Sequence, residues 1–393
     1  MARRILFFAE AVTLAHVARP LALAEGLGTD WDVHLACAPS YAHFVRPPWQ
    51  YHPLDSISPA AFLAALAKGR PLYDIATLNR YVEEDLALIN RVKPDLVVGD
   101  FRLSLSVSAR IAGVPYFNIT NAYWSPYAKI DYPIPEHMLA RMFGPGLATL
   151  LFRLARPAIF AHHARPLNLV RRRYGLAPLP ADLRCTYTDG DQVLYADVPG
   201  FIPMESLPDN HQFLGPILWS PSVPLPPWWD EASGKAPWVY VTLGSSGKME
   251  LLPHILEILQ EFHLPAVVAT AGRAGALPAS TYAADYLPGL EACQQARLVI
   301  CNGGSPTCQQ ALVAGVPILG LPSNLDQFLN MQAVETQGAR VLVRSDRAGV
   351  LNLRKALTEL LNKPEYGNRA GGIASVYARY PATQRFAELV ALL

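Results

Sequence analysis

Residues 298–330 read LVICNGGSPTCQQALVAGVPILGLPSNLDQFLN, and this stretch decides the fold of the second half of the chain. An apolar run ends in an asparagine and two glycines, a helical stretch follows, and a second apolar run leads to Asp326 and Gln327. Short apolar runs that alternate with helical stretches are typical of a parallel sheet buried on both faces. The turn at 302–306 therefore joins a strand to a helix, which is where open α/β sheets bind ligands.

The glycine turn has the features of a phosphate site. Gly303 and Gly304 let a ligand approach the backbone closely, and Pro306 suits the start of a helix, where its missing N–H costs little. The backbone N–H groups of Ser305 and Thr307 would face the ligand, with the helix dipole behind them. These features favour a bound phosphate at the turn.

The end of the window suits a sugar. Asp326 and Gln327 follow the next strand and are expected on the same rim of the sheet, where a carboxylate accepts hydrogen bonds from hydroxyls and an amide both donates and accepts. Taken alone, two glycines are only a tight turn. Together with Gln310, GVP at 315–317 and the Asp-Gln pair, they indicate a nucleotide-sugar site.

Composition excludes several classes of protein. The chain has 393 residues, of which 51% are hydrophobic and 17% charged, so we expect two globular domains. The net charge of +1 gives no global field that would attract nucleic acid or an acidic membrane. Five cysteines without metal-type spacing indicate reduced thiols in a cytoplasmic protein. Residues 3–8 read as a strand rather than a signal peptide, and no apolar run reaches the length of a membrane-spanning helix.

The same alternation of strands and helices occurs twice. It runs through strands near 4–9, 31–37, 95–99 and 114–119 with helices at 18–27, 82–92 and 104–112, and restarts at 238–243. The predicted fold is α/β with two Rossmann-like, doubly wound parallel sheets. We expect an N-terminal domain over 1–215, a proline-rich linker over 216–237, a second domain over 238–375 and a C-terminal helix over 376–393 that packs back on the first domain.

Residues 140–175 are helical, apolar and rich in arginine. We interpret them as a pair of helices over the core of the first domain. The alternative is a surface that dips into a lipid bilayer, as basic amphipathic helices do. Prolines at 157 and 166 shorten any single helix and favour the first interpretation.

These motifs resemble the donor-binding signature of the family 1 glycosyltransferases of GT-B fold, the UDP-glycosyltransferase and macrolide-glycosyltransferase type. That signature, roughly His-Gly-Gly-x-Gly-Thr, Glu-Ala, Gly-x-Pro and Asp-Gln, corresponds here to NGGSPT, QQAL, GVP and DQ. VTLGSS at 241–246 resembles the phosphate-contacting loop, and DYLPGL at 285–290 resembles the segment whose aromatic ring stacks on the base. The resemblance implies two domains facing a central cleft. It also implies donor contacts from Gly244, Ser245, Ser246, Tyr286, Leu287, Asn302, Gly303, Gly304, Ser305, Thr307, Gln310, Asp326 and Gln327.

The first half resembles the acceptor side of the same family. AHVARPLALAEGL at 15–27 is similar to the N-terminal signature, in which a histidine precedes a proline and a helix, and LVVGD at 96–100 is similar to the strand that ends in its aspartate partner. The resemblance implies that His16 is the general base and Asp100 its partner. An imidazole can take the acceptor's proton near neutral pH, and a carboxylate behind the ring fixes its tautomer. A capping role for either residue is the alternative.

Four positions depart from the family pattern. Asn302 stands in place of a phosphate-contacting histidine, Pro306 in place of a glycine, and Gln310 in place of the glutamate that holds the ribose hydroxyls. These changes leave the nucleotide and the sugar open. One extra residue, Arg19, separates the histidine segment from Pro20, and we expect it to change nothing decisive.

The resemblance therefore implies an inverting, metal-independent hexosyltransferase, and we expect it to move a sugar from a UDP-sugar or TDP-sugar to a hydroxyl of an apolar or aromatic small molecule. No cofactor is expected. The loop NAYWSPYAKIDY at 121–132 is the candidate acceptor wall, through Tyr123, Trp124 and Tyr127. The alternatives are a membrane-surface transferase with a lipid acceptor, a nucleotide-sugar epimerase, and a sugar-nucleotide-binding protein with a decayed site.

Overall fold

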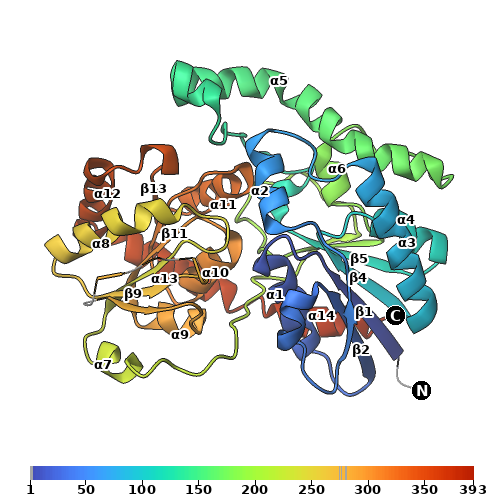
Figure 1. Cartoon of the computed structure of the whole chain (residues 1–393), viewed down its shortest axis with the longest axis horizontal. Helices are drawn as coiled ribbons and strands as arrows, with labels where there is room; N and C mark the ends of the chain where they lie inside the picture. The colour runs from blue at the N-terminus through green and yellow to red at the C-terminus, as the bar shows by residue number, and fades with distance from the viewer. Residues whose placement is uncertain (1–2, 274, 276, 279–280) are drawn as a thin grey trace. The chain divides into compact units, whose positions relative to one another are not determined.

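The computed structural model describes residues 3–273, 275, 277–278 and 281–393 (Figure 1). The chain forms two compact units. The first comprises Met1–Asp131, Leu150–Ile217 and Tyr380–Leu393, and the second comprises Tyr132–Thr149 and Leu218–Arg379.

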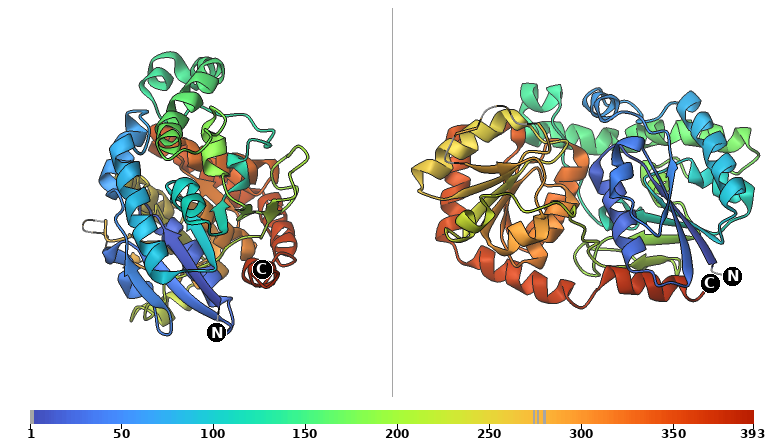
Figure 2. Two further views of the ribbon diagram at one scale, coloured as in Figure 1. Left: turned by 90° about the vertical axis from the view of Figure 1, so that its right-hand side faces the viewer. Right: turned by 60° about the horizontal axis from the view of Figure 1, so that its bottom comes forward.

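The first unit is built on a parallel sheet of order β3-β2-β1-β4-β5-β6-β7. Helices α1 and α14 pack together on one face of it, and α3 and α4 pack together on the other (Figures 1 and 2). The strands are β1 (Arg3–Ala9), β2 (Trp31–Cys37), β3 (Gln50–Pro53), β4 (Leu96–Asp100), β5 (Tyr116–Thr120), β6 (Gln192–Tyr195) and β7 (His211–Phe213). The helices are α1 (Leu14–Glu25), η1 (Pro39–Phe44), α2 (Pro59–Ala67), α3 (Ile75–Val92), α4 (Leu105–Ala112), η2 (Ala122–Trp124), α5 (Met138–Arg173, which begins in the second unit), α6 (Leu183–Tyr187) and α14 (Ala382–Val390).

The second unit repeats this plan with the order β10-β9-β8-β11-β12-β13. Its strands are β8 (Trp238–Thr242), β9 (Ala266–Ala269), β10 (Tyr282–Ala284), β11 (Ala296–Cys301), β12 (Ile318–Gly320) and β13 (Arg340–Leu342). Its helices are α7 (Trp229–Ser233), η3 (Met249–Leu251), α8 (Leu252–Glu261), α9 (Gly289–Gln294), α10 (Ser305–Val313), α11 (Leu325–Thr336), η4 (Ser345–Arg347), α12 (Val350–Asn362) and α13 (Glu365–Tyr377). The prediction of two doubly wound parallel sheets is confirmed.

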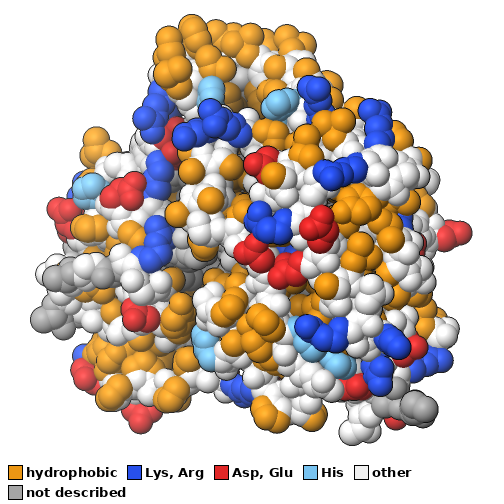
Figure 3. Space-filling model, turned by 45° about the vertical axis from the view of Figure 1, so that its right-hand side comes forward, with side chains coloured by type: hydrophobic (Ala, Val, Ile, Leu, Met, Phe, Trp, Pro, Cys, Tyr) orange, Lys and Arg blue, Asp and Glu red, His pale blue; other side chains and the backbone are white. Residues whose placement is uncertain are grey.

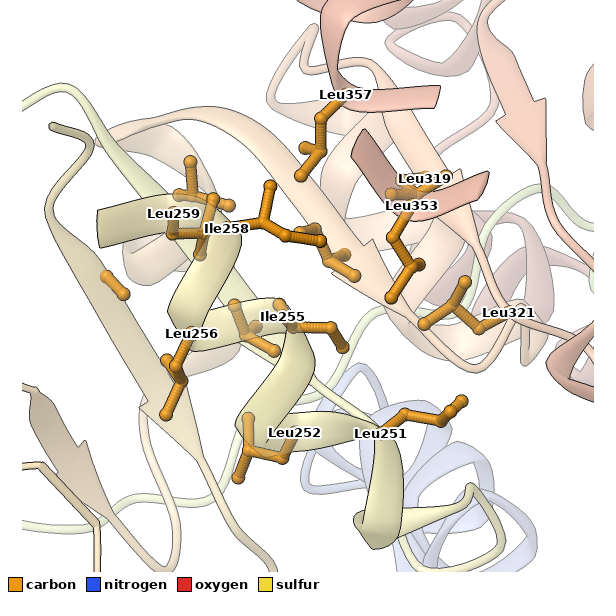
Figure 4. Packing of buried hydrophobic residues seen from close by; sticks show 14 of the residues in the cluster. Leu251, Leu252, Ile255, Leu256, Ile258, Leu259, Leu319, Leu321, Leu353 and Leu357 are labelled. Carbon is orange, nitrogen blue, oxygen red and sulfur yellow. The ribbon is translucent and has the colours of Figure 1, made fainter. Parts of the chain in front are cut away.

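Buried aliphatic side chains hold each sheet to its helices. In the second unit, α8 carries apolar residues on one face, including Leu252, Ile255 and Leu259, and these meet Leu353 and Leu357 of α12 over the sheet (Figure 4). Burying a leucine or isoleucine side chain contributes roughly 1.5–3 kcal/mol. This layer fixes the strands whose ends carry the candidate site.

In both sheets the chain reverses its winding at one point. Strands β1 and β4 are neighbours in the first sheet, with Ala9 paired to Asp100, and β8 and β11 are neighbours in the second, with Thr242 paired to Cys301. The helices that follow two such strands leave on opposite faces of the sheet, so the loops after them open a crevice at the carboxyl edge. Each unit therefore presents one such edge.

The first helix begins earlier than predicted. We expected it over 18–27, but α1 spans Leu14–Glu25, so His16 lies in its first turn and Pro20 lies inside it. The sequence signal was misleading because a proline usually marks the start of a helix. Here Pro20 removes the backbone donor that would otherwise bond to the carbonyl of His16.

The division of the chain also differs from the predicted one. Residues 132–149 belong to the second unit, where Arg344 donates to the carbonyl oxygens of Ile134 and Pro135. Most of the predicted linker belongs to the second unit, which begins again at Leu218, and it packs there, because Trp229 is buried and its ring meets the edge of Trp238 at 5.4 Å. Residues 380–393 belong to the first unit.

Helix α5 departs from the expected pair of helices. It is one 36-residue element with a single non-helical residue, Gly144. An 18-residue window within it has a mean hydropathy of 1.2, and only 11% of that window is buried, so by length and composition alone α5 could cross a membrane. The prediction that no run reaches that length is wrong, because the arginines are spaced widely enough to leave such a window.

Candidate active site

His16 and Asp100 meet at the crevice of the first sheet. His16 Nδ1 lies 2.7 Å from Asp100 Oδ1, and the carboxylate is fully buried while the imidazole is 18% exposed. The backbone explains the meeting, because α1 starts just after β1 and Asp100 is the last residue of β4, the neighbouring strand. Nδ1 of His16 is thus hydrogen-bonded to a buried carboxylate, while part of the imidazole is accessible to solvent.

Arg19 is the residue that the sequence analysis missed. Its guanidinium forms a bidentate pair with the Asp100 carboxylate, in which Nε donates to Oδ2 at 2.7 Å and Nη2 donates to Oδ1 at 2.8 Å. The third nitrogen, Nη1, donates to Asn121 Oδ1 at 2.9 Å. The signal was present, since residues three apart on a helix share a face, and His16 and Arg19 have that spacing.

These contacts assign the tautomer of His16. Arg19 Nη2 also lies 3.1 Å from His16 Nδ1, but it already donates to Asp100 Oδ1 at the shorter distance of 2.8 Å, so the contact between Asp100 and the ring decides the tautomer. If Nδ1 carried no proton, its lone pair would face the carboxylate oxygen at 2.7 Å, and two acceptors would repel each other. Nδ1 therefore carries the proton and donates it to Asp100, which leaves the lone pair on Nε2.

The turn after β4 holds the other side of the imidazole. Phe101 has a left-handed backbone, with φ of +60°, and its ring stacks on that of His16 with centroids 4.6 Å apart. The next residue, Arg102, is buried and bonds to Glu10 at 2.9 Å, to Asp85 and to Glu84. This buried ion network anchors the turn, because moving Arg102 away would leave the carboxylates of Glu10 and Asp85 buried without a cationic partner.

The network makes stability depend on pH. Burial raises the pKa of Glu10 to about 7, although Arg102 opposes the rise. In the unfolded chain the carboxyl titrates near 4.5, so its contribution to stability is fully present below that pH and is lost as the pH rises through about 7. We expect Glu10→Gln, which mimics the protonated form, to lose less stability than the wild type between pH 5 and 8, by up to roughly 3 kcal/mol. Urea unfolding at the two pH values measures this.

Glu83→Gln is the matched control for that prediction, because Glu83 is an exposed carboxylate on α3. It should follow the wild-type pH dependence. Equal losses of stability in Glu10→Gln and the wild type would show that Glu10 does not titrate in this window.

A chain of aromatic rings extends from His16 through the first unit. Phe101 tilts against Tyr187 at 5.3 Å, and Trp124 meets Tyr187 edge-on at 5.0 Å. Trp124 is half-buried, so it can line an acceptor site, whereas Tyr123 is buried and belongs to the core. Tyr127, the third predicted acceptor residue, packs against His211 at 5.5 Å.

In the second unit, the side chain of Ser246 hydrogen-bonds to two other predicted donor residues. Its hydroxyl accepts from Asn302 Nδ2 at 3.2 Å and from Gln327 Nε2 at 3.1 Å. The side-chain oxygen of Asn302 accepts from the backbone N–H of Gly304 at 3.1 Å. The loops after β8 and β11 are thus joined through amides and a hydroxyl. Gly244, Ser245 and Thr307 lie half-buried on the same loops and the first turn of α10.

Two further residues, absent from the sequence prediction, hold these loops. Asn330 of α11 donates to the carbonyl of Gly303 at 2.8 Å, and Arg273 donates to the carbonyls of Gly244 and Gly247, each at 2.9 Å. Gly303 has φ of +83°, and a Cβ there would lie 2.6 Å from Met331. The loop conformation therefore requires glycine at 303 and depends on contacts distant in sequence.

Gln327 is turned inward. Its side chain completes a capping box with Asn324 at the start of α11, and it is buried. Asp326, one residue earlier in the first turn, is half-buried. Of the predicted pair, Asp326 is the side chain on the accessible side.

Gln310 contacts the segment before β8. Its amide nitrogen donates to the carbonyl of Trp219 at 2.7 Å, which a glutamate carboxylate could not do. This contact gives a physical reason for the departure from the family pattern.

The remaining predicted donor residues lie before α9 and at the start of α10. Before α9, Tyr286 is 44% exposed and Leu287 is buried. Ser305, the first residue of α10, is buried and Pro306 is the second.

Within the described part of the chain, no group of three or more His, Cys, Asp or Glu side chains is placed to hold a metal ion. The five cysteines are free, and all but Cys185 are buried.

The chain is similar in sequence to one protein family and to several glycosyltransferases of mycobacteria. Residues 254–392 match the family described as "Erythromycin biosynthesis protein CIII-like, C-terminal domain". A "PGL/p-HBAD biosynthesis rhamnosyltransferase" of Mycobacterium bovis is 49% identical over 381 residues, 96% of this chain and 85% of that protein. A "PGL/p-HBAD biosynthesis glycosyltransferase" of Mycobacterium tuberculosis is 46% identical over 379 residues, 95% of this chain and 89% of that protein.

Among solved structures, the spinosyn rhamnosyltransferase has the same fold. Its complex with the spinosyn aglycone matches with a TM-score of 0.73 at 18% identity, over 99% of this chain and 100% of that one. Its complex with thymidine diphosphate matches with a TM-score of 0.71 at 17% identity over the same shares. At this identity the likeness concerns the fold, which is GT-B.

Proposed function

This chain belongs to the family of the PGL/p-HBAD biosynthesis glycosyltransferases and is itself a glycosyltransferase; on that premise we propose that it is an inverting enzyme of the cytoplasm. It moves a sugar from a TDP-sugar or UDP-sugar to a hydroxyl of an apolar or aromatic molecule. The rhamnosyltransferase name of the 49% identical relative makes a rhamnosyl donor the first choice.

The observation that carries the proposal is the hydrogen bond between His16 Nδ1 and Asp100 Oδ1 at 2.7 Å. It leaves Nε2 of His16 as a base whose ring is oriented by a buried carboxylate. Phe101 and the aromatic rings beyond it supply an apolar surface beside that base, which suits an aromatic or apolar acceptor.

The proposed step is a single displacement. The acceptor oxygen attacks the anomeric carbon while His16 Nε2 takes its proton, and the bond from that carbon to the diphosphate oxygen breaks. The electron pair of the broken bond goes to the nucleoside diphosphate. Asp100 stabilises the imidazolium that forms, and attack from the side opposite the leaving group inverts the anomeric centre.

The second unit would bind the donor through its glycine turns. The backbone N–H groups at the start of α10 and the hydroxyls of Ser245 and Ser246 would carry the growing charge of the diphosphate, so the proposal includes no metal. The thymidine diphosphate complex of the spinosyn enzyme supports TDP as the nucleotide. Tyr286 would stack on the base, and Asp326 would accept from the sugar.

We expect nucleotides to stabilise the protein. A ligand at about 100 times its dissociation constant adds roughly 2.7 kcal/mol to the free energy of unfolding, so TDP or UDP should raise the melting temperature and GDP should not. Thermal-shift titration with the three nucleotides measures this and selects the donor for activity assays.

Asn302→Leu should weaken the nucleotide response, because Asn302 joins the two donor loops. The matched control is Asn352→Leu, an exposed position on α12, which should leave the response unchanged. No response of the wild type to TDP or UDP would reject the donor part of the proposal.

A further inference from the structure

Helix α5 presents a row of leucines to solvent. Leu147, Leu150, Leu151 and Leu154 lie on one face of the continuous helical stretch after Gly144, and their side chains are between 42% and 74% exposed. We call these four residues the leucine face. Three more large apolar residues on α5, Met138, Met142 and Phe143, are also exposed. Figure 3 shows hydrophobic side chains gathered along the top of the view, where Figure 1 draws α5.

The charge on α5 has one sign. Its 36 residues include seven arginines and no aspartate or glutamate. Arg153 is exposed beside the leucine face, with Asp131 at 3.7 Å as a solvent-exposed partner, and Arg141 is exposed before the kink. Cations beside an apolar stripe are complementary to a surface that is anionic at its headgroups and apolar beneath them.

The other half of α5 is held by the protein. Leu167 and Val170 are buried in a cluster with Tyr81 and Val107 of the first unit, and Arg171 bonds to Ser106 and Asp189 there. A helix anchored in this way cannot cross a bilayer as a whole without breaking the cluster. The exposed half can instead lie in the plane of an interface, with its leucines among the acyl chains.

We propose that the leucine face of α5 docks on an anionic lipid surface. The contact is peripheral and reversible. Leucine burial supplies the attraction, and the arginines beside it select anionic headgroups. The proposal does not depend on the transfer chemistry, because lipid binding is measurable with no donor or acceptor present.

Co-sedimentation with lipid vesicles tests the docking. We expect the wild-type chain to sediment with phosphatidylcholine vesicles that contain about a third phosphatidylglycerol, and to bind pure phosphatidylcholine roughly tenfold or more weakly. Leu151→Glu/Leu154→Glu should reduce binding to the anionic vesicles by about tenfold or more, because it places two charges in the apolar stripe. Arg141→Gln/Arg153→Gln should reduce the preference for phosphatidylglycerol and leave the weak binding to phosphatidylcholine.

Leu225→Glu/Leu351→Glu is the matched control, since both leucines are exposed and lie outside α5. It should bind like the wild type, and circular dichroism of every variant should match the wild-type spectrum. Three results would overturn the proposal: no wild-type sedimentation with anionic vesicles, sedimentation that the α5 leucine variant does not reduce, or a lipid-free dimer that this variant dissociates. The last result would assign the leucine face to a second copy of the chain.

Discussion

Replacing His16 with alanine is expected to lower kcat by about 10²–10⁴-fold, the range typical of losing a positioned general base. The structure places this imidazole 2.7 Å from a strand-end carboxylate at the crevice of the first sheet. Donor binding should persist, because the predicted donor residues belong to the second unit. Steady-state kinetics together with the nucleotide thermal shift separate the two effects.

His43→Ala is the matched control for this substitution, since His43 is an exposed histidine in η1 of the same unit. It should retain wild-type kcat. A His16→Ala enzyme with full activity would remove the base from the proposed step and favour a binding protein with a decayed site. Conversion of one nucleotide-sugar into another without an acceptor would point to an epimerase.

Arg19→Met should have the second-largest effect. The substitution removes both hydrogen bonds that Arg19 donates to the fully buried carboxylate of Asp100. Breaking a buried ion pair costs about 3–5 kcal/mol of stability. Without Arg19, the Asp100 carboxylate loses two of the hydrogen bonds that fix its position beside His16 Nδ1, so the imidazole is less firmly oriented as a base. We therefore expect kcat to fall while the thermal shift with TDP or UDP is retained, because the predicted donor residues belong to the second unit. Steady-state kinetics and thermal-shift titration measure the two effects.

Two further variants keep that prediction testable if Arg19→Met folds poorly. Arg19→Lys retains the charge but cannot donate two parallel hydrogen bonds to one carboxylate, and it should restore part of the stability and of kcat. Arg80→Met removes an exposed arginine that pairs with Asp55, and should change little. If Arg19→Met or Arg19→Lys loses stability but keeps the wild-type kcat, Arg19 has only a structural role.

The sequence was sufficient for the parts of the site that depend on backbone order. An apolar run followed by a glycine or an acidic residue predicted the ends of β4, β8 and β11, and the parallel sheet brings such ends together. That logic placed His16 near Asp100, and VTLGSS near NGGSPT, without knowledge of any side-chain contact.

The sequence was insufficient to predict which hydrogen-bond partner a side chain contacts when several are within reach. Arg19 looked like an insertion, because the predicted helix began at residue 18 and hid the spacing that puts Arg19 on the same face as His16. Its bond to Asp100, 81 residues away, was therefore not predicted. Gln310 looked like a weakened ribose contact, whereas its amide bonds to the carbonyl of Trp219. Helix α5 was expected to cover a core, yet apolar composition alone does not say which face is buried.

In the proposed reaction, His16, oriented by Asp100, activates the acceptor hydroxyl in a single displacement. The most direct test is the anomeric configuration of the product, measured by NMR after reaction of the wild-type enzyme with a TDP-sugar of known configuration and a phenolic acceptor. We expect the anomeric centre of the product to be inverted relative to the donor. Retention would contradict the proposed reaction, because one displacement with His16 as the base cannot preserve the configuration.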